Sequence, residues 1–481
     1  MAEKSTQRIP KRILASLLAS VSAGVVPREG APYMAIGRKD EIDAILSDLE
    51  LVNDGGGSMR FLVGRYGSGK SFLIQLIRGY ALERGFLTAD ADLSPERRLY
   101  GSGGAGVATY RELMKNLASR SSPDGGALPK VIAKWIAGLR EGCPEGDGDA
   151  LLAAVRGELR ELEFLVGGFD FARVIFEYYL AAERDDDRAC ASCLRWLRGE
   201  YTTKTEAKRE LGFDVSTVIS DSNWYDFIKL WAALSHKFGY RGLIVFIDEC
   251  VNLYKIPNRV ARENNYEKIL AMFNDTCQGR APYLEIIMGG TPQFLEDPRR
   301  GLFSYEALRS RLCDSRFGTA DGIKNTVGPV LRLARLADDE LLALMVRMTA
   351  LHAQYYGITE RISGEDQLEF MRICMRRAGA DMMITPREML RDYMTLLNVL
   401  MQNPDKSFAD IAGSLTDAAG APNTPNTPNT PNTPNTPNTD SAASVSTAAT
   451  AGNSPRAVSA AEDTARPAEA RAAFDPSDID F

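Results

Sequence analysis

The chain has 481 residues, of which 44% are apolar and 25% are charged, and its formal net charge is −7. This length leaves room for two or three domains, and the composition is that of an ordinary soluble globular protein. The charge excludes a protein that binds nucleic acid through a strongly basic overall field. Ala412–Phe481 holds eight acidic and three basic residues, net −5, which leaves about −2 for the rest. The charge therefore neither shows nor excludes a local basic groove that contacts DNA.

The seven cysteines are scattered and odd in number, which fits free thiols in a reducing cytoplasm. Cys190 and Cys193 form one C-x-x-C without a second pair or a nearby histidine, so ordinary thiols in a helix are favoured over a zinc or redox site. The two histidines, His236 and His352, are far apart in the sequence. This spacing argues against metal or triad chemistry based on histidine.

The N-terminus allows two interpretations. Four basic residues precede a short apolar stretch, as they do in a secretory signal. Within that stretch the apolar side chains recur at helical spacing with serines between them, at Ile13, Leu14, Leu17, Leu18 and Val21. This periodicity favours a packed amphipathic helix. No apolar run in the sequence is long enough to span a bilayer.

A phosphate-binding motif, G-x-x-x-x-G-K-[ST], spans Gly64–Ser71. Met59–Val63 before it predicts a buried strand, and Phe72–Ile77 after it continues as a helix, which is the context this motif requires. Its glycines let backbone N–H groups converge on a phosphate at the helix N-terminus. Lys70 is expected to reach the β- and γ-phosphates, and the Ser71 hydroxyl is expected to bind Mg²⁺. The predicted ATP–Mg²⁺ loop consists of Gly64, Tyr66, Gly67, Ser68, Gly69, Lys70, Ser71 and Phe72.

Residues 86–93 predict a second core strand, and residues 110–238 are mainly helical in pattern. Turns rich in glycine and aspartate separate the helical stretches. A minimal phosphate-loop core does not need this length between its motifs. We therefore expect a helical insertion, which could offer a surface to a partner.

Leu243–Ile247 is a run of five apolar residues that ends in Asp248 and Glu249. Such a run predicts a strand buried on both faces, as in a parallel sheet covered by helices. Asp248 at its carboxyl end is expected to hold the water shell of Mg²⁺. Glu249 is expected to polarise the attacking water as a general base. With the phosphate loop, this pair predicts ATP hydrolysis rather than binding alone.

Leu284–Gly290 predicts a third strand, which ends at Thr291. Farther along, three helical patterns predict a small lid over Asp338–Tyr356, Gly364–Ala378 and Pro386–Met401. Thr385 is expected to cap the last of these helices, and Pro386 suits its first turn.

The composition changes beyond about residue 412. Six copies of Pro-Asn-Thr occupy Pro422–Thr439, within sequence that is too poor in large apolar residues to fold alone. We expect a disordered spacer with extended segments. The terminal Phe474–Phe481 resembles the acidic, Phe-terminated tip of bacterial single-strand-binding proteins. It is expected to bind a partner protein by docking into an apolar pocket, and Lys or Arg side chains are expected around the rim of that pocket.

Four further parts of the sequence are distinctive: Asp92–Arg98, Tyr110–Leu113, the helical insertion and Tyr305–Leu312. Taken together, they resemble the ATP-binding proteins of BREX-type phage-defence systems, relatives of the Orc/Cdc6-like AAA+ ATPases. The resemblance covers Lys11–Met401 and implies a cytoplasmic ATPase that works beside a helicase or other DNA-acting proteins. The chain departs from Orc/Cdc6 proteins in one respect, because no room is left after the lid for a winged-helix domain. Autonomous DNA binding is therefore in doubt.

The resemblance implies roles for further residues. Gly37 and Arg38, about one helix before the phosphate loop, correspond to adenine-side contacts. Thr291 corresponds to sensor 1, which would orient the lytic water with Glu249, although a threonine can also begin an ordinary turn. Arg387 at the start of the last lid helix corresponds to sensor 2, which contacts the γ-phosphate, the alternative being a structural arginine.

An arginine finger that acts across a subunit boundary is implied for the segment after sensor 1. Arg311 is our choice, and Arg309 and Arg316 are alternatives that could instead form surface ion pairs. A finger acting in trans implies a homo-oligomer. It also implies that a neighbouring subunit gates hydrolysis.

The fold class predicted from these features is an α/β P-loop NTPase of the AAA+ (ASCE) type, with a parallel sheet, a helical insertion, a helical lid and a disordered tail. The expected boundaries are 1–34 (N-terminal helix), 35–109 and 239–335 (ATPase core), 110–238 (insertion), 336–411 (lid) and 412–481 (tail). The predicted function is that of a cytoplasmic, antiviral ATPase without membrane contact. Two other functions stay open: a nucleotide-gated signalling switch or scaffold with slow hydrolysis, and a DNA initiator or helicase loader.

Overall fold

The computed structural model describes residues 9–101, 103–313, 325–378 and 385–417. Arg316, the Pro-Asn-Thr repeats and Phe474–Phe481 lie outside the described residues. The chain divides into two compact units, Met1–Ser414 and Leu415–Phe481. The sheet and the candidate site belong to the first unit, which is described below.

In the described residues, five parallel strands form one sheet in the order β2-β3-β4-β1-β5. The strands are β1 (Gly57–Gly64), β2 (Leu87–Asp92), β3 (Leu243–Asp248), β4 (Leu284–Gly290) and β5 (Val330–Leu333). The predicted α/β fold with a parallel sheet is confirmed. Strand β5 was not predicted.

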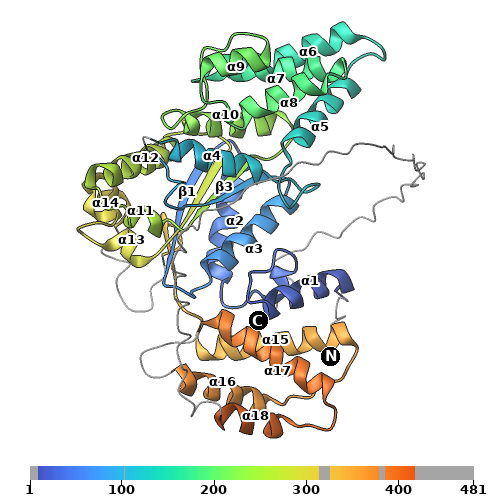
Figure 1. Cartoon of the computed structure of the whole chain (residues 1–481), viewed down its shortest axis with the longest axis vertical. Helices are drawn as coiled ribbons and strands as arrows, with labels where there is room; N and C mark the ends of the chain where they lie inside the picture. The colour runs from blue at the N-terminus through green and yellow to red at the C-terminus, as the bar shows by residue number, and fades with distance from the viewer. Residues whose placement is uncertain (1–8, 102, 314–324, 379–384, 418–481) are drawn as a thin grey trace, which may run out of the picture. The chain divides into compact units, whose positions relative to one another are not determined.

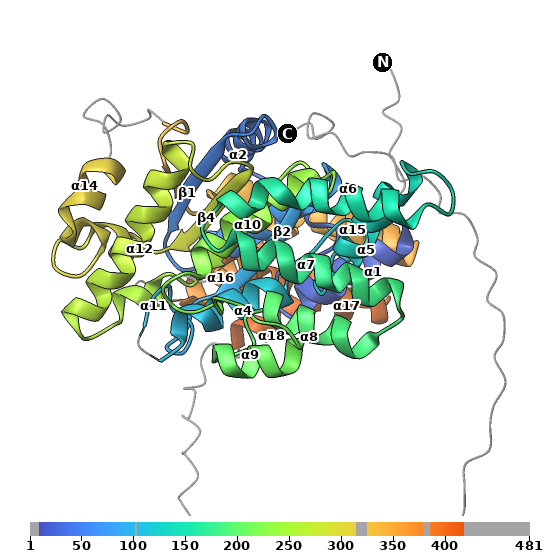
Figure 2. The same ribbon diagram turned by 90° about the horizontal axis from the view of Figure 1, so that it is seen from above.

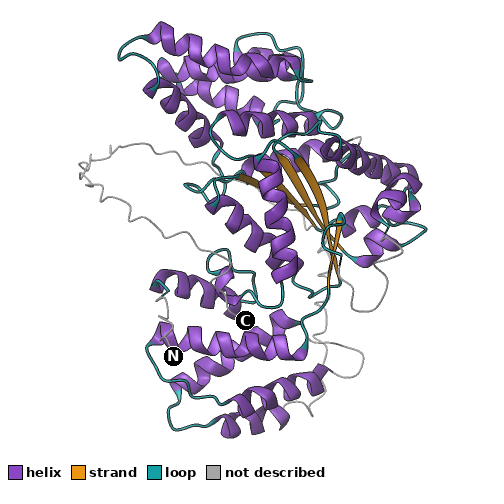
Figure 3. Ribbon diagram, turned by 180° about the vertical axis from the view of Figure 1, so that it is seen from behind, coloured by secondary structure: helices purple, strands orange, loops and turns teal. Residues whose placement is uncertain are grey.

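Helices cover both faces of the sheet (Figures 1 and 3). Helices α2 (Lys39–Asn53) and α3 (Lys70–Glu83) pack on one face, and α4 (Ala105–Lys115), α10 (Trp224–Lys237) and α12 (Arg259–Cys277) pack on the other. Successive side chains of a strand point to opposite faces, so a sheet covered on both sides needs continuous apolar strands. This explains the unbroken apolar run of β3.

The region predicted to be an insertion contains helices that pack mainly on their neighbours in sequence (Figure 2). They are α5 (Leu128–Glu141), α6 (Gly148–Arg160), α7 (Gly168–Glu183), α8 (Asp187–Leu197) and α9 (Lys204–Leu211). Cys190 and Cys193 are free thiols on α8, and burial raises the pKa of Cys193 to about 12. A thiol with so high a pKa is unreactive.

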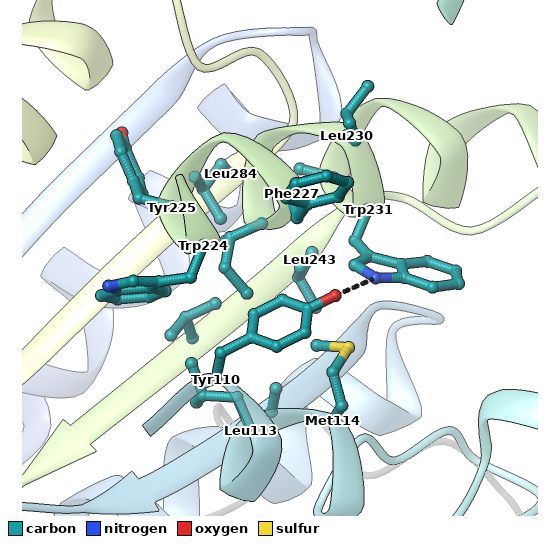
Figure 4. Close-up of a cluster of buried hydrophobic side chains, with 14 of the residues drawn as sticks. Tyr110, Leu113, Met114, Trp224, Tyr225, Phe227, Leu230, Trp231, Leu243 and Leu284 are labelled. Atoms are coloured by element: carbon teal, nitrogen blue, oxygen red, sulfur yellow. Dashed lines mark hydrogen bonds between the residues drawn. The ribbon is translucent and has the colours of Figure 1, made fainter. Parts of the chain in front are cut away.

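Helix α10 joins the insertion to the sheet through a buried aromatic cluster (Figure 4). Trp231 of α10 donates a hydrogen bond from Nε1 to the Tyr110 hydroxyl of α4 at 3.0 Å. The Tyr110 hydroxyl in turn donates to the Leu197 carbonyl at 2.8 Å. The indole N–H of Trp231 and the Tyr110 hydroxyl both have hydrogen-bond partners inside the apolar cluster. Their burial therefore costs little free energy of folding.

The helices predicted to form the lid are α15 (Asp338–Tyr356), α16 (Gly364–Ala378) and α17 (Pro386–Gln402), and α18 (Phe408–Asp417) follows them. The N-terminal helix α1 (Lys11–Ser22) lies against α15 and α17 (Figure 1). Its apolar side is buried, through Leu14, Leu17, Leu18 and Val21. The predicted amphipathic helix is therefore confirmed. The short helices are η1 (Ala31–Met34), η2 (Glu161–Phe164), α11 (Val251–Tyr254), α13 (Pro292–Glu296), η3 (Leu302–Ser304) and α14 (Glu306–Leu312).

Glu285 is a fully buried acid in the central strand β4, next to Ser58 of β1 and Ile244 of β3. Neither of its carboxylate oxygens has a hydrogen-bond partner among the described residues. Burial, and secondarily the nearby Asp48, raises the pKa of Glu285 well above its usual range, while Arg60 opposes the shift. The folded state therefore favours the protonated carboxyl group.

We predict that Glu285 makes the protein less stable as pH rises. The folded state keeps a proton that the unfolded chain releases above a pKa of about 4.3. The free energy of unfolding should then fall by up to about 1.4 kcal/mol per pH unit, until the folded-state pKa is passed. Glu285→Gln should remove this slope in urea unfolding between pH 5 and 8, and Glu145→Gln at an exposed site should keep it. Equal slopes for Glu285→Gln and the wild type would contradict the prediction.

Candidate nucleotide-binding site

The phosphate loop connects the end of β1 to the start of α3. Gly67 and Gly69 have φ values of +79° and +87°, in the left-handed region that glycine adopts most readily. A Cβ atom at Gly67 would lie 2.9 Å from the Thr385 methyl group of the lid, whereas a Cβ at Gly69 would meet no atom within 4 Å. The loop therefore approaches the lid closely at one glycine and faces open space at the other.

The functional groups of both predicted motifs meet at the carboxyl edge of the sheet. Ser71 Oγ donates a hydrogen bond to Asp248 Oδ2 at 2.8 Å, which joins the first turn of α3 to the end of β3. Lys70 Nζ donates to the carbonyl oxygens of Gly64 and Arg65 at 2.9 and 3.2 Å. Burial lowers the pKa of Lys70, while Asp248 and Glu249 oppose this shift. The lysine therefore lies within the electrostatic reach of both acids.

Glu249 adopts a left-handed backbone conformation, with φ of +57°. This conformation is uncommon for residues other than glycine and costs about 1 kcal/mol. The Glu249 N–H donates to Asp248 Oδ1 at 2.8 Å, which stabilises the turn. As a result, the chain turns sharply after Asp248 and the exposed Glu249 lines the same cavity as Lys70 and Ser71.

A cavity of about 300 Å³ extends from the phosphate loop to the lid. Its phosphate-loop side is formed by Tyr66, Gly67, Ser68, Gly69, Lys70, Ser71 and Phe72, and its lid side includes Thr385, Pro386 and Arg387. The wall beyond the loop is mainly apolar, with Val21, Val25, Val26, Pro27, Met34, Ile36, Leu336, Leu344 and Leu390. Val21 and residues 24–27 were not predicted as site residues. They carry no local motif and reach the cavity only because α1 packs on the lid.

Arg38 also lines the cavity, but the residue is only 5% exposed and its guanidinium is bonded to backbone carbonyl groups. Its Nη2 donates to the carbonyl oxygens of Ser68 and Ala334 at 2.8 and 2.7 Å. Gly37, before it, has φ of +70°, and a Cβ there would collide with the Glu340 carboxylate of α15. Gly37 is not among the residues that line the cavity.

Thr291 and Arg311, two other predicted site residues, are held by local hydrogen bonds. Thr291 follows β4, the strand between β3 and β1, and its hydroxyl accepts a hydrogen bond from the Phe294 N–H at 3.3 Å. Arg311 is exposed on α14 and donates to Asn274 Oδ1 at 3.1 Å. Neither Thr291 nor Arg311 lines the cavity among the described residues.

The lid helix α17 begins as predicted. Thr385 accepts a hydrogen bond from the Glu388 N–H at 3.3 Å, and Glu388 Oε2 accepts from the Thr385 N–H at 2.9 Å. This reciprocal pair is a capping box, and Pro386 occupies the first turn. Arg387 therefore projects from the start of α17 and lines the cavity.

The oxygen atoms at the sheet edge suit a hard divalent cation. Ser71 and Asp248 supply a hydroxyl and a carboxylate, and Asp92 at the end of β2 lies beside Asp248 in the sheet register. Burial, then Asp248, Asp90 and Glu249, raise the pKa of Asp92. Within the described part of the chain, no group of three or more His, Cys, Asp or Glu side chains could hold a metal. Mg²⁺ keeps several waters and shares phosphate oxygens, so two protein ligands fit it.

The chain matches the family of BREX system ATP-binding proteins BrxC/D over residues 9–415. It belongs to this family. The match spans the sheet, the insertion, the lid and most of α18, and the predicted resemblance to BREX ATP-binding proteins is confirmed. Among curated proteins, none matches the chain. In the part of the chain that the structure describes, no helix combines the length and apolar character of a membrane span.

Proposed function

We propose that this BREX family member is an AAA+-type ATPase that hydrolyses ATP with Mg²⁺ in phage defence. The observation that carries the proposal is the 2.8 Å hydrogen bond between Ser71 Oγ and Asp248 Oδ2. It joins the two motifs at a cavity that Lys70 and Glu249 also line. A site for binding alone would not need a carboxylate such as Glu249 there.

Each of these residues has a distinct task in the proposed reaction. Lys70 neutralises the charge of the β- and γ-phosphates, and backbone N–H groups of the glycine turn hold their oxygens. Ser71 and Asp248 would hold Mg²⁺, which would supply positive charge against the phosphate oxygens. Glu249 accepts a proton from the water that attacks the γ-phosphate.

Two observations support the AAA+ form of the proposal. Strand β4 lies between β1 and β3, the strands that lead into the two motifs. Sensor 1 is expected at the end of this middle strand, which is where Thr291 lies. The lid brings Arg387 to the cavity, as sensor 2 requires. In this proposal Thr291 orients the lytic water, and Arg387 contacts the γ-phosphate.

The proposed site works in a cytoplasmic homo-oligomer beside a helicase or another DNA-acting defence protein. Arg311 is exposed on α14 and is free to face a neighbouring subunit rather than its own cavity. ATP binding would change how the insertion engages partners, and Phe474–Phe481 would tether one of them. DNA contact, in this proposal, is made through those partners.

The test is phosphate release by the full chain with ATP, with and without Mg²⁺, DNA and co-expressed partner proteins. We predict Mg²⁺-dependent turnover by the wild type and none by Lys70→Ala, whose ATP affinity should fall about a hundredfold or more. Lys115→Ala, on the exposed end of α4, serves as control and should behave as wild type. Equal turnover by Lys70→Ala and the wild type would overturn the proposed site.

Other outcomes of this test support a different function. ATP binding with negligible turnover under every condition indicates a switch or scaffold. Salt-sensitive DNA binding by the isolated protein indicates an initiator or helicase loader.

A further inference from the structure

Arg38 joins the phosphate loop to the start of the lid. The residue is 5% exposed, and a charge this deeply buried is tolerated only when it is paired and hydrogen-bonded. Arg38 Nη1 lies 3.6 Å from Glu41 Oε1, and Nη2 donates to the carbonyl oxygens of Ser68 and Ala334. These two acceptors lie far apart in sequence, one in the phosphate loop and the other after β5.

The bond to Ser68 fixes the direction of one peptide unit in the phosphate loop. The C=O and N–H groups of a trans peptide point in opposite directions, so a Ser68 carbonyl held on Arg38 turns the Gly69 N–H away from Arg38. Within the described residues, no backbone acceptor binds that N–H. Gly69 lines the cavity and has open space where a Cβ would lie. Its N–H group is therefore available to a phosphate oxygen.

The bond to Ala334 reaches the linker between the sheet and the lid. Ala334 directly follows β5, and α15 begins four residues later at Asp338. On the lid side, Glu340 of α15 packs against Gly37, the neighbour of Arg38, and also accepts from the Ala337 N–H at 2.8 Å. The Gly37-Arg38 pair thus contacts the phosphate loop, the linker and the first turn of the lid together.

We propose that Arg38 is a positioning residue that couples phosphate binding at Gly69 to the position of the lid linker. It acts through Ser68 and Ala334 rather than through contact with the adenine base. Phosphate binding favours the loop conformation in which the Ser68 carbonyl faces Arg38, and that conformation also orders the Ala334 linker. This inference rests on the proposed function, because it requires that the cavity bind a nucleotide.

The test uses the full chain and a non-hydrolysable ATP analogue, with affinity and hydrogen exchange of residues 334–340 as readouts. In the wild type the analogue should slow exchange in this segment. Arg38→Met keeps the volume of the side chain but donates no hydrogen bond. It should bind the analogue about tenfold to a hundredfold more weakly and lose the slowed exchange even at saturation. Arg38→Lys, whose ammonium can donate to both carbonyls, should recover part of each effect.

A matched control separates this coupling from the loss of any buried arginine. Arg262 is 6% exposed on α12 and donates to the Ile256 carbonyl at 2.9 Å, and it does not line the cavity. Arg262→Met should therefore lose stability but keep the affinity and the slowed exchange. If Arg38→Met does not fold, Arg38→Met/Glu41→Gln removes the carboxylate left unpaired and is measured instead.

Three results would overturn the inference: wild-type affinity in Arg38→Met, slowed exchange that persists in it, or no slowing in the wild type at saturation. A wild type that does not bind the analogue would overturn the proposed function instead. If the wild type binds and Arg38→Met binds equally well, only the inference about Arg38 fails.

Discussion

Glu249→Gln is expected to bind ATP with wild-type affinity and to hydrolyse it at least about a hundredfold more slowly. Glutamine has almost the same shape as glutamate, so the left-handed turn after β3 and the Ser71–Asp248 contact should persist. What the variant lacks is a carboxylate that can take the proton of the attacking water. The effect should therefore appear in kcat and not in the dissociation constant of ATP.

Measuring both quantities for Glu249→Gln tests this assignment. Binding is measured with a fluorescent ATP analogue, and turnover is measured as phosphate release. Glu263→Gln makes the same chemical change at an ion pair with Arg259 on α12 and should leave kcat unchanged. Wild-type turnover in Glu249→Gln would rule out Glu249 as the base, and weakened ATP binding would show that the carboxylate acts in the ground state.

The parts of the structure that could be predicted from sequence are those with local signals. The phosphate loop needs glycines and a lysine at fixed spacing, and Thr385 needs only Glu388 three residues later to form its capping box. The run that ends at Asp248 is apolar because both faces of β3 are buried. In each case the physical requirement is met by residues that are adjacent in sequence.

The parts that could not be predicted depend on contacts between distant residues. Strand β5 has four residues, one of them the charged and exposed Arg332, and it becomes a strand only by pairing with β1. Val21 and residues 24–27 line the cavity because α1 packs on α15 and α17. The side chain of Arg38 points to Ser68 and Ala334, which the resemblance alone did not indicate. Glu285 is a single charged residue in an apolar run, and only the pairing of β4 with β1 and β3 places it in the centre of the sheet.

These distant contacts connect the N-terminus, the phosphate loop and the lid around one cavity. Helix α1 packs on α15 and α17, and the segment that follows it lines the same cavity as the glycine turn. Thr385 of the lid lies close to Gly67, and Arg38 bonds the loop to the lid linker. A nucleotide in this cavity would touch all three parts.

Arg311→Ala is expected to leave ATP binding intact and to lower turnover about a thousandfold, because an arginine finger stabilises charge on the γ-phosphate only in the transition state. Arg311 bonds to Asn274 of α12 and does not line the cavity of its own chain, so the proposed function requires that it act in trans. Arg309 lies on the same short helix, 3.9 Å from Glu306, and Arg309→Ala is the matched control. Turnover that is lost in Arg309→Ala but kept in Arg311→Ala would assign the finger to Arg309.

Mixed oligomers test whether the finger acts in trans. Lys70→Ala subunits should bind no ATP but still present Arg311, whereas Arg311→Ala subunits should have an intact cavity but lack the finger. Mixing the two inactive variants should restore turnover at the interfaces where a Lys70→Ala subunit presents its arginine to an Arg311→Ala site. Light scattering in the presence of ATP checks that the mixtures assemble. Mixtures that assemble and remain as inactive as their components would contradict a finger acting across the subunit boundary.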